Sequence, residues 1–245
     1  MILFLINAIK IIFLLGFLIF IHEGGHFTVA KLCNVKVNQF AIGFGPKIIE
    51  FKGKETLYAL RLIPLGGFVS MEGENGDSNE ERAFNNASIL KRIAIVVAGA
   101  TVNIIFGLIL YFILASIIYG NIGMAFKALA NYFYALIESI RMLFTGNVGI
   151  NDLTGPVGIS GMVSQTASIK EYIYMMSIIS TSLGITNLLP LPALDGGKIV
   201  LLIIEAIRKK PLKQETEIQL QLLGFSILIV LALVVTCNDI IRIVK

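Results

Sequence analysis

The chain has 245 residues, of which 56% are hydrophobic and only 15% are charged, and its mean hydropathy is +0.84. This composition excludes an ordinary soluble globular domain and indicates an integral membrane protein. The net charge is a modest +4, and no stripe of lysine and arginine is interleaved with aromatic residues, so we expect no nucleic-acid partner.

Four stretches are apolar and long enough to cross a bilayer, which takes roughly 20 residues of helix. They are residues 2–30, 92–119, 172–189 and 217–241. The first resembles a secretory signal in position, but Lys10 lies inside the apolar stretch and no small-residue cleavage site follows, so we expect a retained span. The sequence therefore predicts a single-domain, all-α polytopic membrane protein with four transmembrane helices.

The basic residues predict how these helices are oriented. Eight lysines and arginines lie between the first two stretches, with a ninth, Arg92, at the start of the second; five lie between the last two, but only three between the second and the third. By the positive-inside rule the first and third connections face the cytoplasm, and both termini are extracytoplasmic.

The first connection has strand composition in three places: Val35–Ile42, Ile48–Phe51 and Thr56–Ile63. Gly43–Pro46 has the composition of a turn between the first two strands. Residues 64–69 are apolar but too short and glycine-rich to span. We expect a small membrane-associated β-sheet over residues 35–72, with a re-entrant loop that is buried against protein.

The remaining connections carry weaker signals. Residues 72–86 are acidic and polar, which predicts a solvated cytoplasmic loop. Residues 122–144 are apolar with interspersed charges, which is typical of an interfacial helix. Residues 151–158 are rich in turn formers and lead into the third apolar stretch.

The only two histidines of the chain lie in His22-Glu23-Gly24-Gly25-His26, at the end of the first apolar stretch. On a helix this spacing places both imidazoles on one face, where they can bind one zinc ion, with Glu23 beside it as general base. Two core histidines satisfied by neighbours are the alternative, but two imidazoles and a carboxylate on a buried face need a compensating partner. His26 lies five residues before Lys31, so we expect the site about 7 Å inside the cytoplasmic end of the helix.

A catalytic zinc usually has three protein ligands, and no third histidine exists. The best candidate is Asp195, which closes a long uncharged stretch interrupted by Pro190 and Pro192 and is followed by two glycines. A helix-capping role for Asp195 is the structural alternative. Glu138 and Glu205 are weaker candidates, because the first is expected on the extracytoplasmic side and the second beside a basic helix end.

Several motifs together resemble the site-2 protease family of intramembrane zinc metalloproteases, in particular its bacterial regulator of sigma-E protease branch. Beside the histidine motif, the matching segments are Gly43–Pro46, Arg61–Val69, Glu81–Asn85, Gly155–Ile159 and Asn187–Gly196. The resemblance implies that His22, His26 and Asp195 bind Zn²⁺ and that Glu23 activates water. It further implies that residues 61–71 form a re-entrant β element and that Asn187, Gly66, Gly67 and Phe68 contact the substrate.

The chain departs from that branch at two places. Gly99 and Asn103 are retained in the second apolar stretch, but the usual proline after the glycine is absent. Between Tyr119 and Lys127 there is no room for the PDZ domain that the branch carries before its third span.

The resemblance implies a zinc-dependent endopeptidase of the bacterial cell membrane, which cleaves single-span membrane proteins such as anti-sigma factors or signal-peptide remnants within or near their membrane segment. The alternative is a non-catalytic zinc-binding or zinc-transporting membrane protein. A transporter needs ionisable residues along a path across the bilayer, and the second and fourth apolar stretches have almost none.

Overall fold

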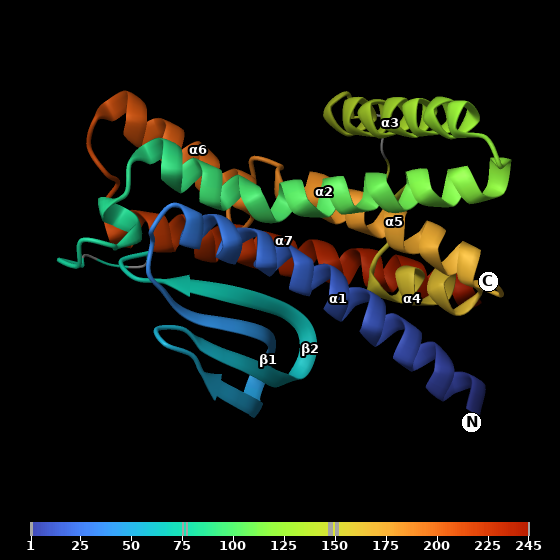
Figure 1. The fold of residues 1–245 in the computed structure, drawn as a ribbon, viewed down its shortest axis with the longest axis horizontal. Helices are drawn as coiled ribbons and strands as arrows, with labels where there is room; N and C mark the ends of the chain where they lie inside the picture. Colours follow the sequence, from blue (N-terminus) through green and yellow to red (C-terminus); the bar gives the residue numbers. More distant parts are fainter. Residues whose placement is uncertain (1, 75, 77, 147–148, 150–151, 245) are drawn as a thin grey trace. The chain divides into compact units, whose positions relative to one another are not determined.

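The computed structural model describes residues 2–74, 76, 78–146, 149 and 152–244, with the backbone alone at 64, 65, 144, 243 and 244. Figure 1 shows long helices and two curved strands. In chain order the elements are α1 (Ile2–Leu32), β1 (Val37–Lys52), β2 (Leu57–Met71), a 3₁₀ turn (Phe84–Asn86), α2 (Ile89–Tyr119), α3 (Ile122–Phe144), α4 (Pro156–Ser164), α5 (Ile169–Asn187), α6 (Asp195–Arg208) and α7 (Gln214–Val244).

Three helices of the described chain are long and apolar enough to cross a membrane: α1, α2 and residues 214–242 of α7. The protein is therefore a multi-pass membrane protein with three candidate spans. The fourth predicted stretch, 172–189, is also helical, but α5 has only 19 residues and carries Lys170 and Glu171 in its first turn. By length and composition α5 is therefore not a candidate span, and the predicted count of four transmembrane helices is not confirmed.

The chain forms two compact units. Unit 1 comprises residues 1–11, 105–181 and 226–245, and unit 2 comprises residues 12–104 and 182–225. Unit 2 has a hydrophobic core to which β1, β2, the 3₁₀ turn, α2 and α6 all contribute, through Phe40, Val69, Phe84, Ile95 and Leu202. Ala30 of α1, the helix that carries both histidines, belongs to the same core, so its burial fixes the sheet and α6 against that helix.

The sheet corrects the predicted boundaries. The turn expected at Gly43–Pro46 is absent, because β1 runs through it and Phe44 still pairs with Ile63. Gly43 and Gly45 have φ values of 88° and 84°, which lets the strand bend without ending. The predicted loop at 64–69 likewise lies inside β2. Two long strands therefore replace three short strands and a loop.

The register gives the sheet one edge near the histidine helix. Residues 39–42 of β1 pair with residues 67–70 of β2 on one side and with residues 57–60 on the other. Residues 67–71 have ladder partners on one side only among the described residues. Residues 67–71 are therefore an edge segment, and residues 39–42 lie inside the sheet.

Residues 72–86, which we call the strap, are not a plain solvated loop. The backbone N–H of Phe84 donates to Glu72 O (2.7 Å) and that of Glu72 donates to Lys36 O (3.0 Å). Phe84 is 3% exposed, and Lys36 Nζ donates to Glu80 Oε2 at 2.6 Å. The strap is thus fastened to the start of β1, and the sequence prediction for this segment was wrong because the burial of Phe84 depends on distant residues.

Unit 1 contains α3 and the short helix α4. The helix predicted at 122–144 is confirmed as α3, and its location at a membrane interface stays a prediction. The sequence suggests turns at 151–158, but α4 begins within this segment at Pro156, because proline is favoured at the first helical position. Asn151 lies outside the described residues. Asp239 Oδ2 accepts hydrogen bonds from the N–H groups of Gly155 (3.0 Å) and Gly158 (2.8 Å).

Candidate metal centre

The packing of α1 orients both histidines. Its buried positions Leu14, Leu18, His22 and Gly25 recur every three or four residues and form one face of the helix. Gly25 is needed on that face, because a Cβ there would lie 2.7 Å from Ala98 O of α2. The close approach of α1 to α2 therefore buries the imidazoles instead of exposing them to lipid.

A broken segment before α6 positions the carboxylate. Ala193 has a φ of 72°, and Leu194 is the N-cap of α6, so Asp195 is the first helical residue and not the cap. A Cβ on Gly196 would lie 2.2 Å from Leu189 O, so only glycine allows the helix to start this close to the preceding loop. The structural alternative for Asp195, a capping role, is therefore wrong.

The three predicted ligand side chains meet in unit 2. His22 Nε2 and His26 Nε2 lie 3.2 Å apart, and they lie 3.3 and 3.5 Å from Asp195 Oδ2. In a tetrahedral site with zinc–ligand distances of about 2.0–2.1 Å, the ligand atoms are about 3.3 Å from one another. Asp195 Oδ2 is buried and has no hydrogen-bond partner in the described structure. Spacing and the unpaired oxygen both fit a bound zinc ion.

The far sides of the imidazoles are held by α2. His26 Nδ1 lies 2.8 Å from Ile95 O, to which its N–H donates, and the amide of Asn103 lies 3.5 Å from His22 Nδ1. These contacts fix each ring so that Nε2 faces the ligand cluster. Gly99 leaves room for the arrangement, because a Cβ there would be 2.3 Å from His26 Nε2.

Comparison with known proteins identifies the family. Residues 10–231 match the model of peptidase family M50. This chain belongs to peptidase family M50, the site-2 protease family.

Whole-length relatives of this M50 protein agree with that assignment. Proteins of Clostridium acetobutylicum (29% identity, 96% of this chain and 97% of the relative), Clostridium perfringens (30%, 91% and 95%) and Helicobacter pylori J99 (26%, 94% and 98%) are all named "Putative zinc metalloprotease". The M50 protein is a metalloendopeptidase whose metal is zinc. The first alignment covers 330 positions, more than the 245 residues of this chain, so that relative has residues without a counterpart here.

The weaker ligand candidates of the M50 protein have other partners. The guanidinium of Arg92 donates to both carboxylate oxygens of Glu205, at 2.5 and 3.0 Å. Glu138 lies 3.4 Å from Arg141, one helical turn away on α3. Neither carboxylate belongs to the group formed by His22, His26 and Asp195.

The predicted substrate contacts are only partly gathered at the site. Gly67 lies against the general-base candidate, because a Cβ there would be 2.9 Å from Glu23 Cγ. Gly66 has a φ of 96° and packs under the ring of Phe44, and Phe68 lies under the guanidinium of Arg61. Asn187 is half-buried at the end of α5, and no contact of its side chain with the metal ligands is described.

Three contributors to the site were not assigned a role from the sequence: Ile95 O, Asn103 and Gly99. Asn103 is a fully buried amide in an apolar helix, which is the type of signal that marks a functional position. The carbonyl of Ile95 has no sequence signature at all.

Proposed function

We propose that this M50 protein hydrolyses peptide bonds within or near the transmembrane segment of single-span membrane proteins. The observation that carries the proposal is the convergence of two imidazoles and one carboxylate beside Glu23, on a helix apolar enough to span a bilayer. A protease of soluble peptides has no need to place these polar groups in such a helix, where each is costly.

In the proposed mechanism His22, His26 and Asp195 would hold zinc, which when bound would supply Lewis acidity that lowers the pKa of a water in the site to about 7. The Glu23 carboxylate is placed to accept a proton from the attacking water and to deliver it to the leaving amine. The N–H of His26 donates to Ile95 O, which keeps Nε2 unprotonated for the metal.

The substrate must offer an extended backbone, because the carbonyls of a helix are already hydrogen-bonded. Residues 67–71 pair on one side only, and Gly67 adjoins Glu23, so we assign this edge to substrate binding by β-strand addition. The segments Val35–Ile42 and Thr56–Ile63, which have strand composition, lie mainly inside the sheet and so offer little free edge. The outward-facing N–H and C=O groups within Gly66–Phe68, together with the Asn187 amide, would hold the unwound strand.

The proposed setting is the bacterial cell membrane, with α5 as a fourth span, both termini extracytoplasmic and the metal centre near the cytoplasmic face. The basic residues that flank the first and third connections support this orientation. Substrates of the proposed class include anti-sigma factors and remnant signal peptides.

The test is co-expression with a panel of tagged single-span proteins, with Glu23→Gln as the comparison. The parent protein should cleave at least one member, and Glu23→Gln should lower the rate by about 10²–10⁴-fold while zinc stays bound. Cleavage by purified Glu23→Gln at the parent rate would contradict the assignment.

A further inference from the structure

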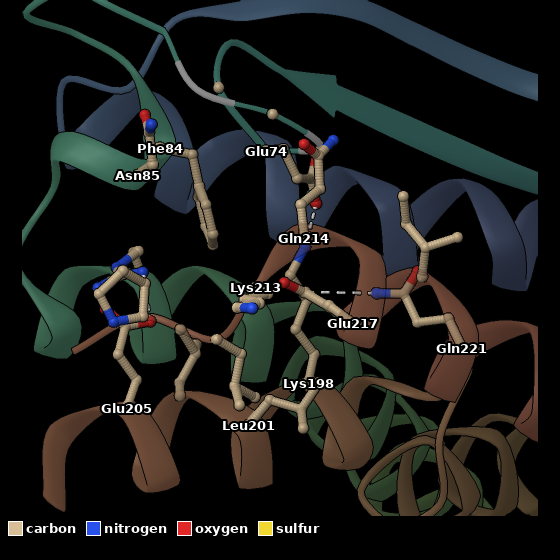
Figure 2. A pocket seen from close by; sticks show the side chains of 17 residues that line it. Glu74, Phe84, Asn85, Lys198, Leu201, Glu205, Lys213, Gln214, Glu217 and Gln221 are labelled. Atoms are coloured by element: carbon tan, nitrogen blue, oxygen red, sulfur yellow. Dashed lines mark hydrogen bonds and ion pairs between the residues drawn. The ribbon is translucent and has the colours of Figure 1, made fainter. Parts of the chain in front are cut away.

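A cavity of about 380 Å³ lies in unit 2 between the strap, α6 and the start of α7. Figure 2 shows Glu74 entering it from the strap and Lys198 from α6, joined by an ion pair. Of the described residues that line this cavity, none is a proposed metal ligand or Glu23. The Glu74–Lys198 pair therefore lies outside the catalytic group itself.

Glu74 connects the substrate edge to α6 with its two carboxylate oxygens. Oε2 accepts a hydrogen bond from the N–H of Met71, the last residue of β2, at 3.2 Å. Oε1 accepts one from Lys198 Nζ at 2.5 Å. One carboxylate thus joins the end of the 67–71 edge to the helix that begins at Asp195.

Lys198 is well placed to transmit this connection. It lies three residues after Asp195, and residues three apart are neighbours on a helix surface. Its ammonium also lies 4.9 Å from the centre of the Phe84 ring, which is part of the unit 2 core. The ammonium of Lys198 therefore contacts both the Phe84 ring and the Glu74 carboxylate, which together fix its position.

This pair differs from the other ion pairs of the strap in its burial. The side chains of Lys198 and Glu74 are 18% and 16% exposed, whereas those of Lys36 and Glu80 are 29% and 40% exposed. Desolvating both charges is unfavourable, and an apolar pair of similar volume often stabilises a fold as well or better. A buried pair at this point is better explained by the geometry that it fixes than by the stability that it adds.

We propose that Glu74 and Lys198 are positioning residues for peptide hydrolysis, which set the distance between the substrate edge at 67–71 and the helix that supplies Asp195. The inference rests on the proposed function. Displacing one reacting group by about 1 Å is enough to reduce a rate by about 10²-fold, so a single tie between the two elements has a large effect on turnover.

The experiment compares Lys198→Met, Glu74→Gln and the exchanged pair Glu74→Lys with Lys198→Glu, using a single-span protein that the parent cleaves. Each single variant should lower kcat about 10–100-fold with KM within threefold and one zinc per chain, and the exchange should recover most of the loss. The matched control is Lys36→Met, which removes the more exposed Lys36–Glu80 ion pair of the strap and should leave kcat within twofold.

The open cavity beside Lys198 allows a second readout. In Lys198→Ala, added ethylammonium can enter the cavity and take the place of the lost ammonium, so kcat should rise at least threefold, with no rise in the parent or in Lys36→Met. Rescue by a small cation separates a positioning charge from a general loss of fold.

Three results would overturn the inference: an exchanged pair no better than the single variants, an equal loss in Lys36→Met, or full recovery of Lys198→Met by added zinc. The last would mean that the pair acts only through zinc affinity. If the parent itself cleaves no single-span protein, the proposed function fails; if the parent is active and the variants match it, only the positioning role fails.

Discussion

Asp195 in unit 2 and Asp239 in unit 1 are both carboxylates among apolar helices, yet their surroundings differ. Asp239 is 3% exposed, and its Oδ2 receives the N–H groups of Gly155 and Gly158. Asp195 Oδ2 is buried without a hydrogen bond and faces two imidazole nitrogens. A carboxylate that the protein itself satisfies holds structure together, whereas one left open is ready for a ligand.

The Asp239 arrangement has a counterpart at the other end of α4. Lys10 Nζ donates to Thr166 O at 3.0 Å, two residues beyond the last residue of α4. A negative group at the N-terminus and a positive group beyond the C-terminus both complement the dipole of this helix. The buried Asp239 and the half-buried Lys10 thus hold the two ends of this short helix.

The largest effects are expected when each of the two carboxylates, Asp195 and Asp239, is replaced by alanine. Asp195→Ala should lower zinc affinity by at least 10²-fold with the fold retained, because it removes one of three ligands. Asp239→Ala should keep one zinc per chain but lower the free energy of unfolding by about 2–4 kcal/mol, because two buried N–H groups lose their acceptor. Zinc content and thermal unfolding in detergent measure both. If Asp239→Ala lost zinc at a temperature where the protein is still folded, the purely structural role of Asp239 would be contradicted.

The two glycines inside the histidine motif sharpen the comparison. Gly25→Ala should destabilise the protein by about 1–3 kcal/mol and lower zinc affinity, because its Cβ would press on Ala98 O. Gly24→Ala is the matched control, since a Cβ there has nothing within 4 Å; it should be neutral or stabilise by up to about 1 kcal/mol. Equal melting temperatures of the two variants would show that α1 and α2 can separate at no cost.

Lys10→Met tests the other end of α4. Loss of the ammonium leaves Thr166 O without this donor, and we expect the free energy of unfolding to fall by about 1 kcal/mol with zinc binding unchanged. Lys127→Met, on an exposed position of α3, is the control and should have no effect. If Lys10→Met were as stable as the parent, Lys10 would not stabilise the C-terminal end of α4.

The smallest effect concerns Glu55, between β1 and β2. Hydrogen bonds from Arg82 and then Lys31 lower its pKa to about 2. Because the folded-state pKa lies below the ordinary value of 4.5, the contribution of Glu55 is complete above that pH and is lost as the pH falls towards 2. Unfolding measured between pH 5 and 3 should show a slightly flatter pH dependence in Glu55→Gln. A parent and variant with the same slope would mean that solvent screens the charge fully.

The sequence is most informative where one residue type is rare. Two histidines at a spacing of four, and one acid closing an uncharged stretch, predict the three side chains that the structure brings together, because polar groups are costly in an apolar helix and mark functional positions. The long helices follow from hydropathy alone. Hydropathy does not predict where Asp195 lies in space. The third protein ligand that a catalytic zinc usually requires is what points to this residue.

Predictions failed where a residue's environment is supplied by distant parts of the chain. Gly43–Pro46 has the composition of a turn, yet the pairing of Phe44 with Ile63 continues the strand. The burial of Phe84 and the Glu74–Lys198 pair join residues more than 100 positions apart. No local pattern encodes such contacts, so the sequence alone predicts an ordinary loop for the strap.

Gly224 of α7 lies against the loop that precedes Asp195, where a Cβ would come within 2.3 Å of Pro192 O. Helix α7 therefore supports the loop that carries the proposed ligand Asp195, although none of its described residues belongs to the ligand group. A larger side chain at position 224 would displace the loop that contains Pro192 and weaken zinc binding at the proposed site. The candidate metal centre consequently depends on residues about 200 positions apart, with the histidines on α1 and the support for the Asp195 loop on α7.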